Sequence, residues 1–117
     1  MDRSQKLFNM IFADIYPLYL QKVAKKGRTQ EELDFVLMWL TGYDAEGLQR
    51  QLDSKVTLQA FFDNAPQINP AAKSIKGIIC GIRIEDIQDS LMQKIRWIDK
   101  LVDDLAKGKN IADTYKL

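Results

Sequence analysis

The most constraining feature of the sequence is a long amphipathic stretch near its C-terminus. From Asp89 to Lys107, apolar residues recur at alternating intervals of four and three: Leu91, Ile95, Ile98, Val102 and Leu105. This spacing places the apolar residues on one face of an α-helix. Asp89 can cap its first turn, and Gly108 follows the last apolar residue as a helix stop. Such a stripe has to be covered, either by the rest of the chain or by a second copy.

The width of this stripe indicates whether the rest of the chain or a second copy covers it. Trp97 and Leu101 widen the stripe beyond the narrow seam of a coiled coil, which favours a core-facing helix in a bundle. The alternative is self-association as a homodimer, because a two-fold dimer is the commonest closed oligomer. The candidate seam for self-association consists of Leu91, Ile95, Ile98 and Val102.

Helix start and stop signals recur upstream. Thr29-Gln30-Glu31-Glu32 is a capping box that precedes an apolar stripe, and Gly42 can close that helix. Asp44 and Thr57 are further N-cap candidates, and Asn69-Pro70 combines an N-cap with proline at the first helical position. With a helix capped by Asp14, these signals predict helices over 14–26, 29–41, 44–53, 58–64 and 69–81.

The helix expected from Asp14 to about Lys26 has Pro17 in its first turn, where the missing N–H breaks no intrahelical bond. Gly27 follows as a stop, and the stripe consists of Ile15, Leu18, Tyr19 and Val23.

Two segments fit both helix and strand. Residues 5–13 allow a short extra helix or a strand. Residues 77–84 continue the stripe of the helix that starts at Asn69-Pro70, but their isoleucines also suit a β-strand. The sequence as a whole predicts one globular all-α domain over residues 1–117, a compact bundle of about five to six helices with a short β segment allowed near 77–84.

Composition narrows the function classes. The chain has no histidine, which excludes Ser-His-Asp and Cys-His nucleophile pairs and every His-containing metal site. Its one cysteine, Cys80, lies in an apolar stretch and is interpreted as structural rather than nucleophilic. No metal site and no cofactor are predicted. The longest unbroken apolar run is six residues, 35–40, so no membrane span is expected, and the absence of a secretory signal indicates a cytoplasmic protein.

Three carboxylates on the last helix are close enough in sequence to suggest a metal site. Asp99, Asp103 and Asp104 lie within about one turn of each other. Basic residues are interleaved with them at helical spacing, and this pattern predicts intrahelical ion pairs instead: Arg96, Lys100 and Lys107 are the cations.

Nucleic acid is an unfavoured partner. The segments 30–41 and 44–53 can be drawn as a helix-turn-helix, but the second carries three carboxylates and only Arg50 as a cation. The basic residues Lys22, Lys25, Lys26 and Arg28 are countered by the acids that follow them. A helix-turn-helix DNA binder is therefore kept only as a third hypothesis.

Two places offer a site for a small molecule. Trp39 and Tyr43 flank a helix end, and Asn69 lies in an Ala-Pro-Gln-Ile-Asn-Pro loop that can line the same corner. The alternative is that both aromatic residues are core and turn residues.

Arg83 and Glu85 precede the last helix, close to Asp86 and Asp89. A carboxylate pair there can act as acid and base while Arg83 binds an anionic group. The alternative is that Asp86 or Asp89 is an N-cap and that Arg83 pairs with Glu85 or Asp86.

Several strings resemble a known family: Tyr16-Pro17-Leu18-Tyr19, Trp39-Leu40-Thr41-Gly42-Tyr43, and Cys80-Gly81-Ile82-Arg83-Ile84-Glu85. They are similar to a family of small bacterial proteins catalogued as domain of unknown function 2200, and the likeness covers nearly the whole chain. Ser90 departs from the proline expected after Asp89, which leaves the helix unaffected. The resemblance implies a bacterial, cytoplasmic, stand-alone domain and no particular activity.

The sequence therefore favours a non-enzymatic cytoplasmic binding or interaction module, with an unidentified protein or small molecule as partner. The alternative is a small-molecule-binding protein or small enzyme, with a site near Trp39, Tyr43, Arg83 and Glu85.

Overall fold

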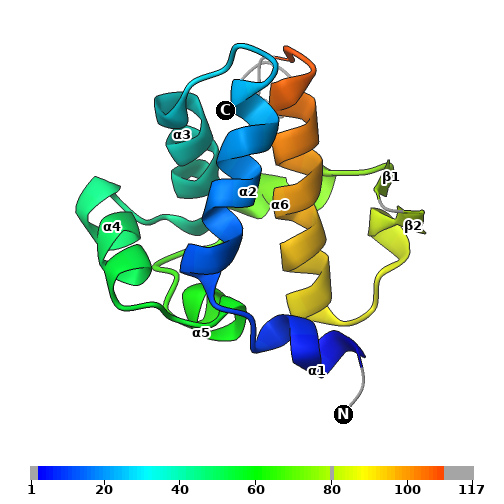
Figure 1. Cartoon of the computed structure of the whole chain (residues 1–117). Coiled ribbons are helices and arrows are strands. Elements are labelled where there is room, and N and C mark those ends of the chain that lie inside the picture. Colours follow the sequence, from blue (N-terminus) through cyan, green and yellow to red (C-terminus); the bar gives the residue numbers. More distant parts are fainter. Residues whose placement is uncertain (1–2, 80, 110–117) are drawn as a thin grey trace.

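The computed structural model describes residues 3–79 and 81–109. This part of the chain is mostly α-helical with one short β-hairpin, as predicted (Figure 1). None of its helices is long and apolar enough to cross a bilayer. The elements in chain order are α1 (Arg3–Phe8), α2 (Phe12–Ala24), α3 (Gln30–Thr41), α4 (Ala45–Asp53), α5 (Leu58–Asp63), the 3-10 helix η1 (Pro70–Ser74), β1 (Ile78–Ile79), β2 (Ile82–Arg83), the 3-10 helix η2 (Ile84–Asp86) and α6 (Ser90–Ala106).

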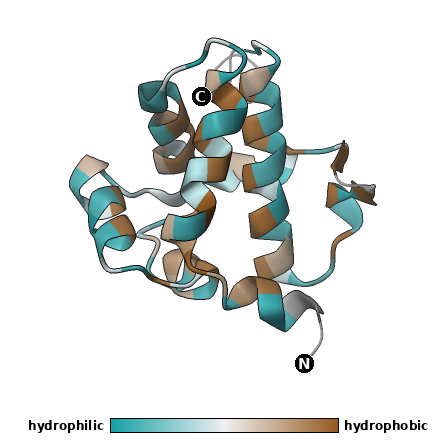
Figure 2. Cartoon of the chain, in the orientation of Figure 1, coloured by the Kyte–Doolittle hydropathy of each residue, from teal (hydrophilic) through white to brown (hydrophobic). Residues whose placement is uncertain are grey.

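Three helices form the centre of the molecule. α2 and α6 lie side by side and run in the same direction, and α3 packs against both of them (Figure 1). The buried residues of these three helices are almost all apolar. Hydrophobic and hydrophilic residues alternate along α2 and α6 in Figure 2. α5 and α1 close the end of the bundle at which α2 and α6 begin.

The predicted N-caps set most helix starts. Thr29 forms the capping box: its Oγ1 accepts from the Glu32 N–H at 3.2 Å, and its own N–H donates to Glu32 Oε1 at 3.1 Å. A carboxylate or hydroxyl at an N-cap satisfies one of the free N–H groups of the first turn. The side chains of Asp44, Thr57 and Asp89 cap α4, α5 and α6 in the same way.

The start of α2 differs from the prediction. The helix begins at Phe12 rather than after Asp14, so Pro17 lies in its second turn instead of its first. Tertiary contacts fix this earlier start. The Phe12 N–H donates to the Val56 carbonyl at 2.8 Å, and the Phe12 ring stacks on Phe61 with 4.0 Å between ring centroids. Residues 5–13, left open by the sequence, hold part of α1 and one isolated β-bridge between Ile11 and Thr57.

The helix predicted over 69–81 is wrong beyond its first turns. Asn69 does act as a cap, but only the short 3-10 helix η1 follows, and Gly77 with φ +118° interrupts the stripe. The β-branched residues after Gly77 form the hairpin, in which Ile78 pairs with Arg83 and Ile79 with Ile82. The strand alternative for residues 77–84 is thereby confirmed.

The end of α3 is tied to the loop before η1. Of its last four carbonyls, Met38 O accepts from the Gly42 N–H, and Thr41 O accepts from the Gln67 N–H. Asn69 supplies the other two donors: its backbone N–H reaches Leu40 O at 2.9 Å, and its side-chain amide reaches Trp39 O at 3.2 Å. All four carbonyls that a helix end leaves free are therefore satisfied.

Two constraints require glycine at position 42: its left-handed backbone and the close approach of the loop before η1. Gly27, in the turn after α2, and Gly42, the C-cap of α3, both have left-handed φ, +79° and +81°. A Cβ on Gly27 meets nothing within 4 Å, whereas one on Gly42 lies 2.9 Å from the backbone N and O of Gln67.

We expect Gly27→Ala to cost about 1–2 kcal/mol of unfolding free energy, the usual penalty of the left-handed conformation. Gly42→Ala should cost about 1–3 kcal/mol more, because overpacking adds to that penalty. Urea unfolding of both variants measures the difference, and equal losses would contradict the close contact.

Tyr16 connects α2 to α3. Its hydroxyl donates to Asp34 Oδ1 and accepts from the side-chain amide of Gln30 at 3.0 Å. Burial, followed by the hydrogen bond to Asp34, raises the pKa of Tyr16 from 10.0 to about 12. The raised pKa means that the folded state favours the protonated phenol.

This raised pKa predicts a loss of stability in alkali. A group whose pKa is higher in the folded state contributes stability below its unfolded pKa, and loses that contribution as the pH rises through the folded value. We expect Tyr16→Phe to cost about 1 kcal/mol at neutral pH, the usual net value of a hydrogen bond. That deficit should shrink as the pH rises from 10.0 towards about 12. Urea unfolding across this range checks the prediction; a constant deficit would contradict it.

Candidate functional site

The corner predicted from the sequence exists as two adjacent hollows at the end of α3. Both include Gly42 and Pro66. One, of about 390 Å³, is also lined by Trp39 and Asn69; the other, of about 350 Å³, is also lined by Tyr43 and Asn64. The structure therefore brings together the aromatic and loop residues that the sequence singled out here.

The polar groups of this corner are largely engaged within the chain. Tyr43 is buried, and its hydroxyl donates to the Phe61 carbonyl at 2.6 Å. Asn69 uses both ends of its side-chain amide, accepting from Ala71 N–H at 2.9 Å and donating to Trp39 O. These bonds hold two helices and a loop at a fixed angle, which matches the core-and-turn interpretation of the corner.

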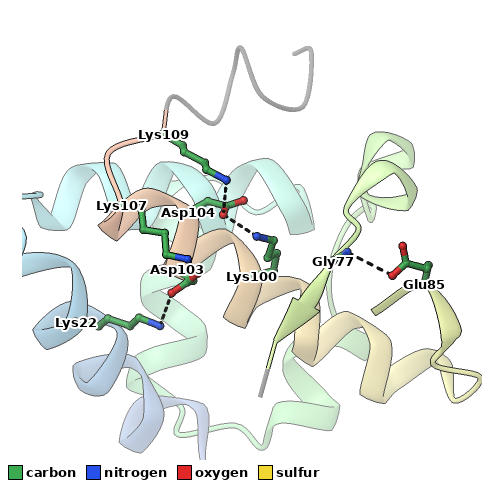
Figure 3. A network of polar contacts seen from close by, with 8 residues as sticks. All are labelled: Lys22, Gly77, Glu85, Lys100, Asp103, Asp104, Lys107 and Lys109. Carbon is green, nitrogen blue, oxygen red and sulfur yellow. Dashed lines mark hydrogen bonds and ion pairs between the residues drawn. The ribbon is translucent and has the colours of Figure 1, made fainter. Parts of the chain in front are cut away.

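Arg83 and Glu85 do not join Trp39 and Tyr43. The hairpin with Arg83 and the adjoining η2 with Glu85 lie on the far side of α6 from α3 and α4 (Figure 1). Both side chains are exposed. Glu85 Oε1 accepts from the Gly77 N–H at 3.3 Å, which closes the base of the hairpin (Figure 3). The four residues therefore belong to two separate places.

The candidate seam on α6 faces the interior. Ile95, Ile98 and Val102 are buried within the single chain, and Leu91 is half-buried. The stripe is covered by the chain's own helices, so these residues are not displayed to a second copy. Cys80, which the sequence suggested to be structural, lies outside the described residues.

A third hollow, which the sequence did not indicate, is an apolar groove of about 350 Å³ along α2 and α6. We call it the α2–α6 groove. Its floor is made of buried side chains: Ile15, Tyr19, Leu58, Ile95 and Val102. Its rim is made of Leu7, Met10, Leu18 and Ile79, contributed by α1, the α1–α2 link, α2 and β1.

One part of the α2–α6 groove is polar. Lys22, Arg96 and Asp99 line it, together with the hydroxyl-bearing Tyr19. Arg96 Nη1 donates to Asp99 Oδ2 at 3.0 Å. Burial raises the pKa of Asp99 and outweighs the lowering effect of Arg96. Burial, with a smaller contribution from the Asp99 charge, also raises the pKa of the Tyr19 phenol, which stays protonated at neutral pH.

Ion pairs beside the groove connect α2 to the end of α6 (Figure 3). Asp103 accepts from Lys22 at 3.2 Å and from Lys107 at 2.9 Å. Burial acts to raise the pKa of Asp103, but these two lysines lower it overall. The pairs Lys100–Asp104 and Arg96–Asp99 confirm the ion pairs predicted on α6.

Asp104 departs from the solvated face that its spacing suggested. It is 1% exposed, and its Oδ1 accepts from Lys100 at 2.9 Å and from Lys109 at 3.4 Å. A buried carboxylate needs such compensation, because removing a charge from water is costly.

The groove could not be predicted from the sequence, because the exposure of Leu18 is not visible in its spacing. Its spacing places it with the core residues of α2, yet its side chain is 60% exposed and lies on the groove rim. On α6, Arg96 and Asp99 border the apolar stripe, but an i,i+3 ion pair explains that pattern equally well. Only the packing of α1 and the hairpin beside α2 and α6 creates the concavity.

The arrangement of residues in this groove is suited to binding a ligand. Its floor removes water from an apolar group, and its polar part can orient a head group by hydrogen bonds, the combination typical of small-molecule sites. Within residues 3–79 and 81–109, no group of three or more His, Cys, Asp or Glu side chains is placed to hold a metal ion.

Comparisons with known proteins agree with the resemblance noted from the sequence. The chain is 46% identical to uncharacterized protein SP1917, whose crystal structure matches with a TM-score of 0.92 over 100% of this chain and 98% of that one. None of the curated proteins matches the sequence. Residues 6–116 match the model of DUF2200, described as an uncharacterized protein conserved in bacteria. With a match over nearly its entire length, the chain belongs to the bacterial DUF2200 family.

Proposed function

We propose that this protein is a non-enzymatic binding module whose ligand site is the α2–α6 groove. The observation that carries the proposal is the contrast between the groove's buried apolar floor and its exposed apolar rim. Leu18 is 60% exposed and Met10 is 45% exposed, although both lie beside a well-packed core. A concave apolar surface with a few convergent polar groups is the usual form of a ligand site.

Two features favour a small ligand over a second copy of the chain. The α6 stripe, which was the candidate seam, is buried against the chain's own core. The α2–α6 groove, at about 350 Å³, lies within the size range of small-molecule pockets, about 300–1,000 Å³. We also propose a cytoplasmic location, which the use of a single cysteine supports.

A neutral fluorescent probe tests this proposal. N-phenylnaphthylamine fluoresces more strongly in apolar surroundings, and we expect the protein to bind it in the groove. Leu18→Glu places a charge on the groove rim without disturbing the core, and should weaken binding about tenfold, equivalent to about 1.4 kcal/mol. Phe35→Glu is the matched control, since Phe35 is 47% exposed on α3 and does not line the groove. Fluorescence titration of the three proteins measures the effect.

Two outcomes would contradict the proposal. Equal losses of binding in Leu18→Glu and Phe35→Glu would indicate general surface hydrophobicity rather than a groove. Unchanged binding of the probe to Leu18→Glu would place its site elsewhere. Circular dichroism melts of both variants establish that each is folded before it is titrated.

A further inference from the structure

In the polar part of the α2–α6 groove, hydrogen-bond donors outnumber the acceptors that lie beside them. The Tyr19 side chain lines the groove, and its hydroxyl makes no hydrogen bond to any described residue. Arg96 donates to Asp99 through Nη1, while its Nε–H is buried and has no partner in the described part of the chain. The Lys22 ammonium has three donors and one carboxylate contact, to Asp103, and its side chain is 48% exposed.

The acceptors beside these donors are few. Asp99 is the only carboxylate among the described residues that line the groove, and one of its oxygens already accepts from Arg96. Burial also disfavours its charged form. Asp103 lies outside the lining and is shared between Lys22 and Lys107. The groove therefore presents two cations and one carboxylate to any ligand.

The rest of the groove requires an apolar ligand body. The floor side chains Ile15, Leu58 and Ile95 offer no polar atom, and Leu18 and Met10 flank them at the rim. An elongated hydrocarbon chain can lie along the floor with its head group beside Lys22, because Ile15, Tyr19 and Lys22 follow one another along α2. A carboxylate supplies acceptors for these donors, whereas an alkane and a protonated amine supply none.

We propose that the α2–α6 groove binds a single-chain carboxylic acid, with its hydrocarbon chain on the apolar floor and its carboxylate facing Lys22, Tyr19 and Arg96. This inference rests on the proposed function, because it specifies the ligand chemistry of the same site. Charge-assisted hydrogen bonds from a guanidinium and an ammonium are about twice as strong as neutral ones, and they determine the preference for a carboxylate.

Three ten-carbon probes separate the two parts of the proposal. Decanoate, decanol and decylamine share one chain and differ in head group, and each is titrated calorimetrically into the full-length protein below its micelle concentration. We expect decanoate to bind about tenfold more tightly than decanol, a difference of about 1.4 kcal/mol. Decylamine should bind more weakly than decanol, since it meets Lys22 and Arg96 with a like charge. Methyl resonances of Leu18 and Val102 should shift with decanoate.

Head-group variants test the named donors. Arg96→Met keeps an apolar stem and should lower decanoate affinity about tenfold while leaving decanol affinity unchanged. Tyr19→Phe removes only the hydroxyl and should act in the same direction, whereas Arg96→Lys keeps a charge and should retain the preference. Arg50→Met is the matched control: Arg50 also pairs with a carboxylate of its own helix, but it lies on α4 outside the groove.

The outcomes distinguish the two proposals. If decanol binds as tightly as decanoate, or if Arg96→Met leaves decanoate affinity unchanged, the carboxylate inference is overturned and the groove remains a binding site. If no probe binds and no groove methyl shifts, the proposed function is overturned as well. Tighter binding of decylamine would assign the head-group contact to Asp99 and overturn the inference. Circular dichroism of each variant shows whether a lost affinity reflects unfolding. Arg96→Lys keeps the positive charge, so loss of the decanoate preference in this variant would contradict the role of that charge.

Discussion

α6 packs against both α2 and α3 and buries Ile98 and Leu101 completely, and the positions of the other elements follow from this packing. Full burial of such a side chain contributes about 1.5–3 kcal/mol each. α2 and α6 lie side by side along this contact, with their N-terminal ends beside α1 and α5 (Figure 1). The ion pair between Lys22 and Asp103 joins the two helices again near the ends of both (Figure 3).

The α2–α6 groove is a consequence of that arrangement. α1 and the hairpin pack beside the central helices without filling the space between them, so the outer edges of two core stripes form a floor. Arg96 and Asp99 are half-buried and border the buried stripe of α6, between its core residues and solvent. A polar part beside an apolar floor thus arises from ordinary amphipathic helices, and the donors left without acceptors there are what suggest a ligand.

Much of the fold could be predicted because its determinants are local. Thr29, Asp44, Thr57 and Asp89 each satisfy N–H groups within their own first turn, so their helices begin where the sequence indicates. The start of α2 could not be predicted, because a hydrogen bond to Val56 and stacking on Phe61 fix Phe12 from residues more than forty positions away. The sequence predicted the corner at Trp39 and Asn69. It also grouped Arg83 and Glu85 with that corner, but the structure places these two residues elsewhere.

The sequence by itself determined the helical class, most helix boundaries, the core-facing stripe of α6 and the family, since periodicity and caps act over three or four residues. Only the tertiary structure decided which individual residues at the edges of each stripe are covered. Leu18 has the spacing of a core residue and is exposed, and Asp104 has the spacing of a solvated residue and is buried. Burial depends on what packs against a residue, and those neighbours come from distant parts of the chain, so the groove is visible only in the folded molecule.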